Sequence, residues 1–318
     1  MPDKTVIITG ANSGIGKEAS LKFAEAGYTV VMACRNLEKS KPVKEEVVER
    51  SKNDKVLLEE LDMSSFASIE NFSDQIKTHF SKLDILINNA AYFNHGESYR
   101  LSADNTEITF ATNVAGPFLL TTLLSPLLKK SDDARVLNAS SNIIKHFFSP
   151  KKMLTLNNIK GITDNQYKHS VYSSYCNSKM ALLMLTFKMA GLYQNSGIKF
   201  YSLQINGARM SDETLKKFTP GWRFVAIIQN LFFPPPEFMG SNYFKICTEK
   251  RFSKYSGIHL NHKLQIMKAA PENPGLNHSW GIECYPALAC NMAVQEKILK
   301  ICKTLTANYT GNYTERTL

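Results

Sequence analysis

Thr5-Val-Ile-Ile-Thr-Gly10-Ala-Asn-Ser-Gly14-Ile-Gly16 is the stretch of sequence that decides the fold of this chain. Its first five residues are β-branched, as is typical of a buried strand. Three glycines follow within seven residues, and Lys17–Ala26 then has the apolar spacing of an amphipathic helix. A strand that passes through a glycine-rich turn into a helix is the first unit of a parallel α/β sheet.

The same alternation continues through the first two thirds of the chain. Further strands are predicted at Thr29–Ala33, Lys55–Leu61, Leu83–Ile87, Arg135–Ala139 and Lys199–Ile205. Helices are predicted between them at Glu38–Lys52, Ser65–Ser81, Ala103–Lys129 and Ser174–Gln194. Six parallel strands with helices on both faces predict an α/β fold with a doubly wound, Rossmann-type sheet in three α/β/α layers.

Composition excludes several classes of protein. The 318 residues carry a net charge of +10, but no run of Lys and Arg alternates with aromatic residues, so we expect no nucleic-acid partner. The six cysteines form no CxxC pair and no His/Cys cluster, so we predict no metal site and reduced thiols. No apolar run reaches ~18 residues, so a transmembrane helix is not expected.

The glycine-rich turn predicts a dinucleotide site. Glycines let the backbone approach the cofactor closely, and the free N–H groups of the helix that follows receive its pyrophosphate. The second strand ends in Ala33-Cys34-Arg35-Asn36 without an acid, and an arginine there suits the 2′-phosphate of NADP(H). The expected cofactor contacts in these two turns are Gly10, Asn12, Ser13, Gly14, Ile15, Gly16, Arg35 and Asn36.

A second motif, Tyr175-Cys-Asn-Ser-Lys179, lies on the predicted helix Ser174–Gln194. Residues four apart share one face of a helix, so the Lys179 ammonium is expected to stabilise a phenolate and lower the pKa of Tyr175. A tyrosine of this kind is a proton donor or acceptor near neutral pH. Together with a nicotinamide cofactor, the pair predicts an oxidoreductase.

These residues resemble the short-chain dehydrogenase/reductase family, most closely the branch with the retinol dehydrogenases and the WW-domain oxidoreductase. The resemblance runs in the family's order from the start of the chain to about Ser211. The matching motifs are Thr9-Gly-x-x-x-Gly-Ile-Gly16, Asp62-Met63, Asn88-Asn89-Ala90-Ala91, Asn113-Val-Ala-Gly-Pro-Phe118, Asn138-Ala-Ser-Ser141 and Tyr175-x-x-x-Lys179.

The resemblance implies a role for each matching residue. Tyr175 would be the general acid in reduction or the base in oxidation, while Lys179 would lower its pKa and hold the nicotinamide ribose. Ser141 would hydrogen-bond the substrate oxygen, and Asn113 would hold a helix kink and a water linked to Lys179. The further cofactor contacts implied are Asp62 and Met63 at the adenine and Asn89 and Ala90 at the cofactor floor.

The chain also departs from the family pattern. Ala91 stands where a glycine is usual, and Asn206-Gly207 replaces Pro-Gly after the sixth strand. Ser211 stands where a threonine commonly contacts the nicotinamide amide. The gap between Ser141 and Tyr175 is longer than in most members, and the extra residues 145–169 are expected to form a loop over the substrate cleft.

The chain is interpreted as one domain over 1–318, with a cofactor-binding and catalytic core at 1–210 and a lid, last strand and C-terminal extension at 211–318. Expected elements there are the apolar segment Trp222–Phe233, helices Glu237–Lys250 and Cys290–Leu305, and a strand Tyr255–Leu260. Trp222–Phe233 is interpreted as a lid for an apolar substrate. Core packing and a peripheral membrane contact, aided by Lys245, Lys250, Arg251 and Lys254, are its alternatives.

The predicted function is NADP(H)-dependent interconversion of an apolar aldehyde or ketone, such as a retinoid, steroid or lipid carbonyl, and its alcohol. Asn89-Ala90-Ala91-Tyr92 and Phe232-Phe233-Pro234-Pro235 also resemble protochlorophyllide reductases, which reduce a C=C bond. A non-catalytic NADPH-sensing scaffold is the alternative outside the enzymes. The expected localisation is cytoplasmic or at a membrane surface, and the oligomeric state stays open between monomer and homodimer.

Overall fold

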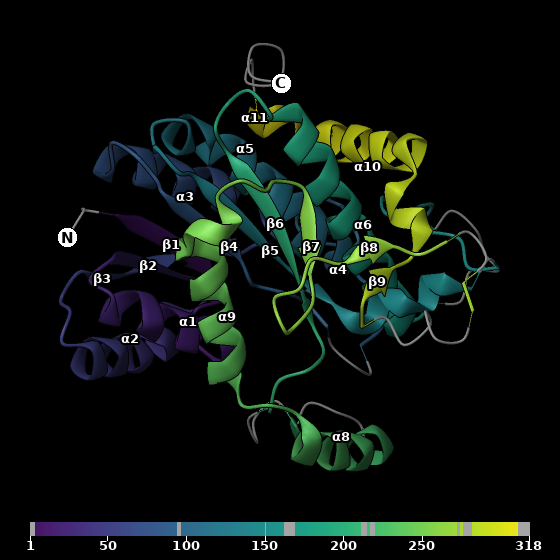
Figure 1. The fold of residues 1–318 in the computed structure, drawn as a ribbon, viewed down its shortest axis with the longest axis horizontal. Helices are drawn as coiled ribbons and strands as arrows, with labels where there is room; N and C mark the ends of the chain where they lie inside the picture. The colour runs from purple at the N-terminus through teal and green to yellow at the C-terminus, as the bar shows by residue number, and fades with distance from the viewer. Residues whose placement is uncertain are drawn as a thin grey trace.

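The computed structural model describes residues 4–93, 97–149, 151–161, 169–210, 215–216, 220–271, 274–275 and 282–310. It confirms the predicted fold class, because seven parallel strands form one sheet in the order β3-β2-β1-β4-β5-β6-β7 (Figure 1). The strands are β1 (Thr5–Thr9), β2 (Thr29–Cys34), β3 (Val56–Glu60), β4 (Ile85–Asn88), β5 (Arg135–Ser141), β6 (Lys199–Ile205) and β7 (Ile258–Leu260). The seventh strand is shorter than the predicted Tyr255–Leu260.

The strand order reverses at β1, which lies between β2 and β4. The chain winds outward from β1 to β3 on one side and from β4 to β7 on the other. The connections that follow β1 and β4 therefore leave the sheet in opposite directions, and ligands of doubly wound sheets bind at such a reversal. Both the glycine-rich turn and Asn89 leave the sheet there.

Helices cover both faces of the sheet. One layer contains α1 (Gly14–Glu25), α2 (Leu37–Ser51) and α9 (Pro236–Thr248), and the other contains α3 (Phe66–His79), α5 (Gly116–Leu128) and α6 (Val171–Leu192). Alternation along β1 supplies both cores, since Val6 and Ile8 pack with the first layer and Ile7 packs with the second. Helix α10 (Met292–Leu305) packs on the outside of α6, and the short α11 (Ala307–Thr310) packs on α5 and α3.

The predicted helix Ala103–Lys129 is instead three joined pieces. α4 (Ile108–Phe110) runs into a π-helical turn, η1 (Ala111–Ala115), and then into α5. The continuous stretch 108–128 is long and apolar enough to cross a membrane, contrary to the sequence expectation. Almost all of it is buried, and it packs against α3 and α6, as a core helix does.

The C-terminal part adds two small features. A two-stranded sheet pairs β8 (Lys268–Ala269) with β9 (Cys284–Tyr285), and α8 (Pro220–Phe232) stands apart from both helix layers (Figure 1). Pro234 to Pro236 end α8 and start α9, as predicted from the missing N–H group of proline. Most of the predicted loop 271–281 lies outside the described residues.

Candidate active site

The glycine-rich turn holds α1 hard against the end of β1. A Cβ on Gly16 would come within 2.4 Å of the Gly10 carbonyl oxygen and 2.6 Å of Asn89 Nδ2, so no larger residue fits. Ser13 is the N-cap residue of α1, but its side chain makes no capping hydrogen bond, and the first turn holds no acid. The N-terminus of α1 therefore keeps free N–H groups and a positive dipole end, which together favour an anion.

Asn89 fixes this turn from the neighbouring strand. Its Nδ2 donates to the carbonyl oxygens of Thr9 (2.9 Å) and Gly10 (3.2 Å), and the Thr9 hydroxyl accepts the N–H groups of Asn89 (3.0 Å) and Ala90 (2.9 Å). The Tyr243 hydroxyl on α9 donates to Asn89 Oδ1 at 3.1 Å. The Asn89 side chain is thus a clamp on the turn. Sequence analysis missed Thr9 and Tyr243 because a single sequence does not reveal contacts between distant segments.

Arg35 and Asn36 follow β2 at the same edge of the sheet, but their side chains differ in role. Arg35 is exposed, and within the described part of the chain it has neither a hydrogen bond nor an ion pair. Asn36 Oδ1 accepts the Lys39 N–H at 2.9 Å and caps α2, so its side chain is already occupied. Arg35 is therefore the residue of this pair that has a side chain free for a ligand.

Asp62 and Met63 shape the turn after β3. Asp62 Oδ1 accepts both the N–H (2.9 Å) and the hydroxyl (2.7 Å) of Ser64, an arrangement that leads into α3. The Met63 side chain is buried. A Cβ on Gly116 would lie only 2.5 Å from the Met63 carbonyl oxygen. Both predicted adenine contacts therefore also have structural roles in this turn.

The structure brings together three of the four predicted catalytic residues. Tyr175 and Lys179 lie one turn apart on α6, and Ser141 at the end of β5 hydrogen-bonds Tyr175. Lys179 Nζ lies 5.6 Å from the centroid of the Tyr175 ring and donates to the carbonyl oxygen of Ala139 at 2.7 Å. Strand β5 therefore positions both partners of the α6 pair.

The electrostatics differ from the sequence expectation. Burial raises the pKa of Tyr175 to about 12, and the hydrogen bond with Ser141 opposes only part of that rise. Burial lowers the pKa of Lys179 to about 8. The expected lowering of the tyrosine pKa by the ammonium does not occur in this structure, because Lys179 directs its Nζ at Ala139. Tyr175 consequently carries its proton at neutral pH.

Asn113, the fourth predicted catalytic residue, lies in the π-helical turn η1, and π-turns are frequent at functional sites. Its Oδ1 accepts the Tyr92 N–H at 2.7 Å, and its Nδ2 donates to the Tyr92 carbonyl oxygen at 3.1 Å and to Ser178 Oγ at 3.0 Å. Asn113 therefore ties the segment after β4 to α6. The position agrees with the expected helix kink, and Ser178 is a partner that sequence analysis missed.

Phe93 is a further residue that sequence analysis missed. Its ring lies against the Tyr175 ring, with centroids 4.3 Å apart and an interplanar angle of 30°, while Phe93 remains partly exposed. It follows the Asn88-Asn89-Ala90-Ala91 motif by two residues. The apolar Phe93 ring lines the site beside the Tyr175 ring, so this side of the site is suited to an apolar group.

The segment after β6 takes the place of the family's Pro-Gly. Asn206 accepts Gln204 Nε2 at 3.0 Å and places its own Nδ2 2.7 Å from His262 Nδ1. Gly207 has a φ of +124°, and a Cβ there would meet the Phe233 ring at 2.5 Å, so this position needs glycine. Ser211 lies outside the described residues.

Of the extra residues 145–169, those that the structure describes pack toward the C-terminal extension. Phe147, Phe148 and Leu156 are buried, and they line a cavity of about 390 Å³ together with residues 287–297. Residues 162–168 lie outside the described chain, so the predicted cover over the substrate cleft stays a prediction.

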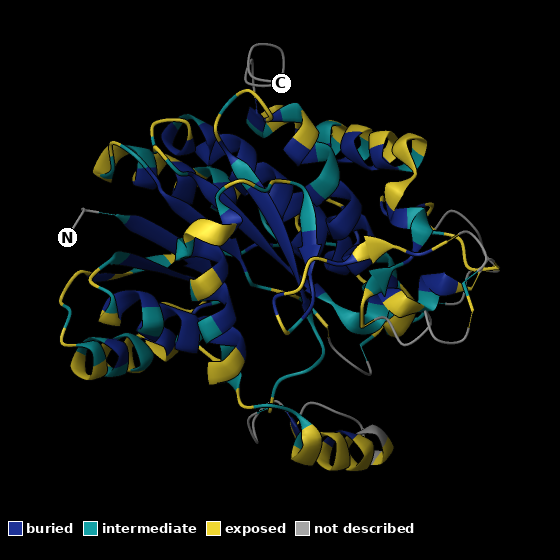
Figure 2. Cartoon of the chain, in the orientation of Figure 1, coloured by how far each residue is buried: buried dark blue, intermediate teal, exposed yellow. Residues whose placement is uncertain are grey.

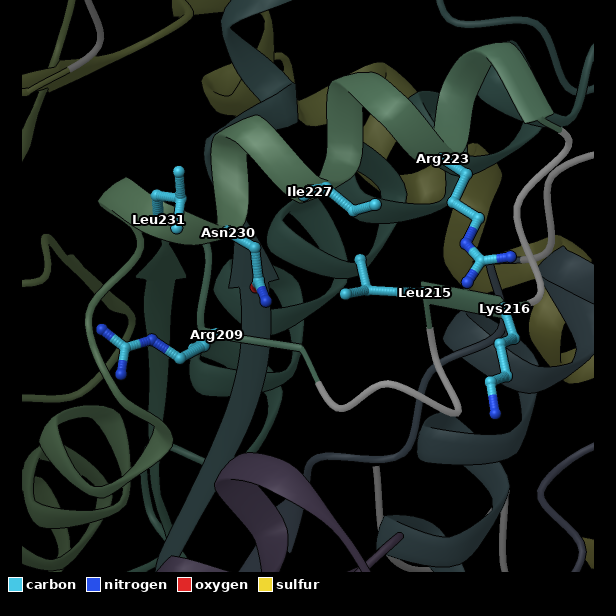
Figure 3. A pocket seen from close by; sticks show the side chains of 7 residues that line it. All are labelled: Arg209, Leu215, Lys216, Arg223, Ile227, Asn230 and Leu231. Atoms are coloured by element: carbon cyan, nitrogen blue, oxygen red, sulfur yellow. The ribbon is translucent and has the colours of Figure 1, made fainter.

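A second cavity, of about 710 Å³, lies beneath α8 (Figure 3). It is lined by Arg209, Leu215, Lys216, Arg223, Ile227, Asn230 and Leu231. Neither this cavity nor the smaller one is lined by Tyr175 or by the glycine-rich turn. α8 stands where the lid was predicted, and Asn230 on this helix pairs with Met210 in the segment that leaves β6.

Comparison with known proteins identifies the relationship. The sequence profile described as short chain dehydrogenase matches residues 4–149, which contain the glycine-rich turn, Asn89, Asn113 and Ser141. The chain belongs to the short-chain dehydrogenase family. This short-chain dehydrogenase is 33% identical over 211 residues to retinol dehydrogenase 13 of Mus musculus, covering 66% of this chain and 60% of the relative. It is 36% identical over 203 residues to retinol dehydrogenase 12 of Mus musculus, covering 64% and 61%.

The WW domain-containing oxidoreductase of Gallus gallus is 41% identical over 138 residues, covering 43% of this short-chain dehydrogenase and 33% of the relative. The chain thus spans about 60% of the length of the two retinol dehydrogenases that it matches. Among solved structures, an uncharacterized Mycobacterium paratuberculosis protein matches with a TM-score of 0.66 and 20% identity, covering 96% of this chain and 93% of that one. A short chain dehydrogenase of Shigella flexneri complexed with NADP matches at 0.63 and 20%, covering 82% and 97%. These likenesses confirm the fold.

Proposed function

We propose that this short-chain dehydrogenase interconverts a carbonyl compound and its alcohol with NADP(H). The observation that carries the proposal is the meeting of Tyr175, Ser141 and Lys179 at the carboxyl end of β5, in the sheet whose β1 ends in the glycine-rich turn. The Tyr175 hydroxyl as proton donor and the Ser141 hydroxyl beside it suit the binding of one substrate oxygen. The retinol dehydrogenase names of the relatives support the same reaction class.

The residues present fit a nicotinamide dinucleotide. The N-terminus of α1 has no side-chain cap and no acid, and Gly16 brings it close to β1, so the pyrophosphate would lie there. Arg35 is an unpaired cation at the end of β2 and would hold a 2′-phosphate. When bound, the cofactor supplies or accepts the hydride.

The chain's own residues manage the proton and the position of the substrate. Tyr175 is protonated at neutral pH, so it donates its phenolic proton to the carbonyl oxygen as the carbonyl becomes an alcohol. Ser141 holds the same oxygen with its hydroxyl. In the reverse reaction the same hydroxyl would have to act as the base, as a phenolate, and the burial that raises the pKa of Tyr175 opposes that form.

An apolar aldehyde or ketone is the substrate class that the surroundings of Tyr175 favour. The apolar Phe93 ring lies against the Tyr175 ring, with the ring centroids 4.3 Å apart. We expect retinal, a medium-chain aldehyde or a steroid ketone to be reduced with NADPH, measured as loss of NADPH absorbance. NADPH binding without turnover of any of the three would contradict the reductase and favour an NADPH-sensing scaffold.

Arg35→Asp is expected to raise the KM for NADPH by about ten- to a hundredfold, since one charge-assisted contact contributes about 1.5–3 kcal/mol. The KM for NADH should change by no more than about threefold or should fall, because NADH lacks the 2′-phosphate. Steady-state kinetics with both cofactors test this expectation. Arg251→Asp is the matched control, since Arg251 is an exposed arginine paired with Glu249 and lies far along the chain. Equal effects on NADPH and NADH would exclude the 2′-phosphate role.

A further inference from the structure

Helix α8 presents large apolar side chains to solvent. Phe232 is 82% exposed, Leu231 73% and Phe224 67%. The other exposed apolar residues of the helix are Val225, Ile227 and Ile228. Figure 2 shows almost the whole of α8 exposed where it stands away from the two helix layers. So much apolar surface on a single helix marks an interaction site.

The orientation of α8 is fixed by its polar side. Asn230 accepts the Met210 N–H at 2.5 Å and donates to the Met210 carbonyl oxygen at 3.0 Å, and Ala226 is buried. At about 100° per residue, the six exposed apolar residues fall within a sector of about 160° centred opposite Ala226. Ile227 and Leu231 lie at the edge of this sector nearest Asn230 and also line the cavity beneath α8. A surface helix normally points its apolar face at the core. α8 is inverted, with its small and polar side toward the protein.

Cations lie beside this apolar face. Arg209, Lys216 and Arg223 line the cavity beneath α8, and Figure 3 shows Lys216 and Arg223 at the same end of it. Within the described chain, none of the three pairs with a carboxylate. The sequence from 209 to 223 holds four basic residues against Asp212 and Glu213, which lie outside the described residues. The surface is therefore apolar with a cationic border.

We propose that α8 is a membrane-contact helix that lies in the interface of a bilayer containing anionic lipid. An interfacial helix inserts its apolar face at the headgroup–acyl boundary and keeps basic residues at the phosphates. A second copy of the chain would cover the apolar face as well, but it would set the same cations against each other. Charge complementarity therefore favours the anionic bilayer over a dimer.

The basic residues expected to help such a contact do not lie at this surface. Lys245, Lys250, Arg251 and Lys254 lie at or beyond the last turn of α9, while α8 precedes its first turn. A helix of 13 residues is about 20 Å long, and Figure 1 shows α9 leading away from α8. These four residues serve instead as internal controls for the role of charge.

Vesicle co-sedimentation of the full chain tests the proposal without any need for turnover. We expect the protein to sediment with phosphatidylcholine vesicles that contain phosphatidylserine. Phe224→Ser combined with Phe232→Ser should weaken this binding by at least about tenfold, because two exposed aromatic anchors are lost. Met292→Ser is the matched control, since Met292 is 80% exposed on α10 and should leave vesicle binding unchanged.

Charge and oligomeric state separate the remaining outcomes. Lys216→Gln with Arg223→Gln should weaken binding to vesicles with phosphatidylserine, while Lys250→Gln should not. The proposal is overturned if the native chain does not sediment with the anionic vesicles or if the phenylalanine variant sediments as the native chain does. It is also overturned if gel filtration shows a dimer that the phenylalanine variant dissociates and that does not bind vesicles. All six substituted sites are exposed, so the melting temperature of each variant should stay near that of the native chain.

Discussion

Tyr175→Phe is expected to lower kcat for carbonyl reduction by about a thousandfold, within the range that a positioned general acid contributes. The substitution removes only the hydroxyl, so the ring still packs against Phe93 and α6 keeps its register. Ser141 then has no proton donor beside it, and Lys179 is turned toward the Ala139 carbonyl oxygen. The affinity for NADPH should change by less than about threefold, because the residues proposed to hold the two phosphate groups, Arg35 and the N-terminus of α1, belong to other elements than α6.

Tyr172→Phe is the matched control for this experiment. Tyr172 lies three residues earlier on the same helix, is exposed, and contacts His146. We expect its kcat to stay within about twofold of the native value. Single-turnover reduction and NADPH fluorescence titration measure both variants. Native-like turnover in Tyr175→Phe would exclude Tyr175 as the proton donor. If the variant lost NADPH binding instead, its lower turnover would reflect cofactor affinity and not proton transfer.

The sheet could be predicted from the sequence because each strand carries its own local signal. The β-branched run Thr5–Thr9 and the apolar run Lys199–Ile205 are strands with the predicted bounds. The catalytic residues could be placed together for a related reason, since parallel strands end at one edge of the sheet. Ser141 ends β5, and the helix with Tyr175 returns over the same edge.

Contacts through space could not be predicted in this way. The pairing of Tyr243 with Asn89 joins residues 154 apart in the chain, and the Phe93 ring reaches Tyr175 across 82 positions. The direction of the Lys179 side chain depends on where the Ala139 carbonyl lies, which no helical spacing reveals. The surroundings of α8 could not be predicted either. The apolar pattern of a helix gives the width of its apolar face but does not reveal what that face contacts.

A buried ion network below β5 is the basis of the second large expected effect. Arg135 is 1% exposed, and its guanidinium donates to Asp133 Oδ2 at 2.5 Å and to the carbonyl oxygens of Ile246 (2.7 Å) and Glu249 (3.1 Å). Lys199 Nζ donates to Asp133 Oδ1 at 2.7 Å. The network joins β5, β6 and the end of α9, so it fixes the C-terminal part to the sheet.

Asp133→Asn is expected to lower the free energy of unfolding by about 2–3 kcal/mol, because it leaves the buried Arg135 charge without its counter-ion. The cost stays below that of a fully buried pair, since the Asp133 side chain is 30% exposed and Arg135 keeps two carbonyl acceptors. Asp132→Asn is the matched control. Its carboxylate is exposed, so its substitution should change stability by less than about 0.5 kcal/mol. Urea unfolding followed by circular dichroism measures both.

The pH dependence of this difference tests its electrostatic origin. Burial opposes ionisation of Asp133, but hydrogen bonds from Arg135 and Lys199 outweigh it and hold the pKa of Asp133 below its ordinary value of 3.8. A carboxyl whose pKa is lowered by folding stabilises the native state above its unfolded pKa, and this contribution disappears as the pH falls through the folded pKa. The stability gap between the native chain and Asp133→Asn should therefore be constant near neutral pH and narrow below pH 3.8. A gap of the same size at every pH would mean that Asp133 acts through shape and neutral hydrogen bonding, because only the ionised carboxylate neutralises Arg135.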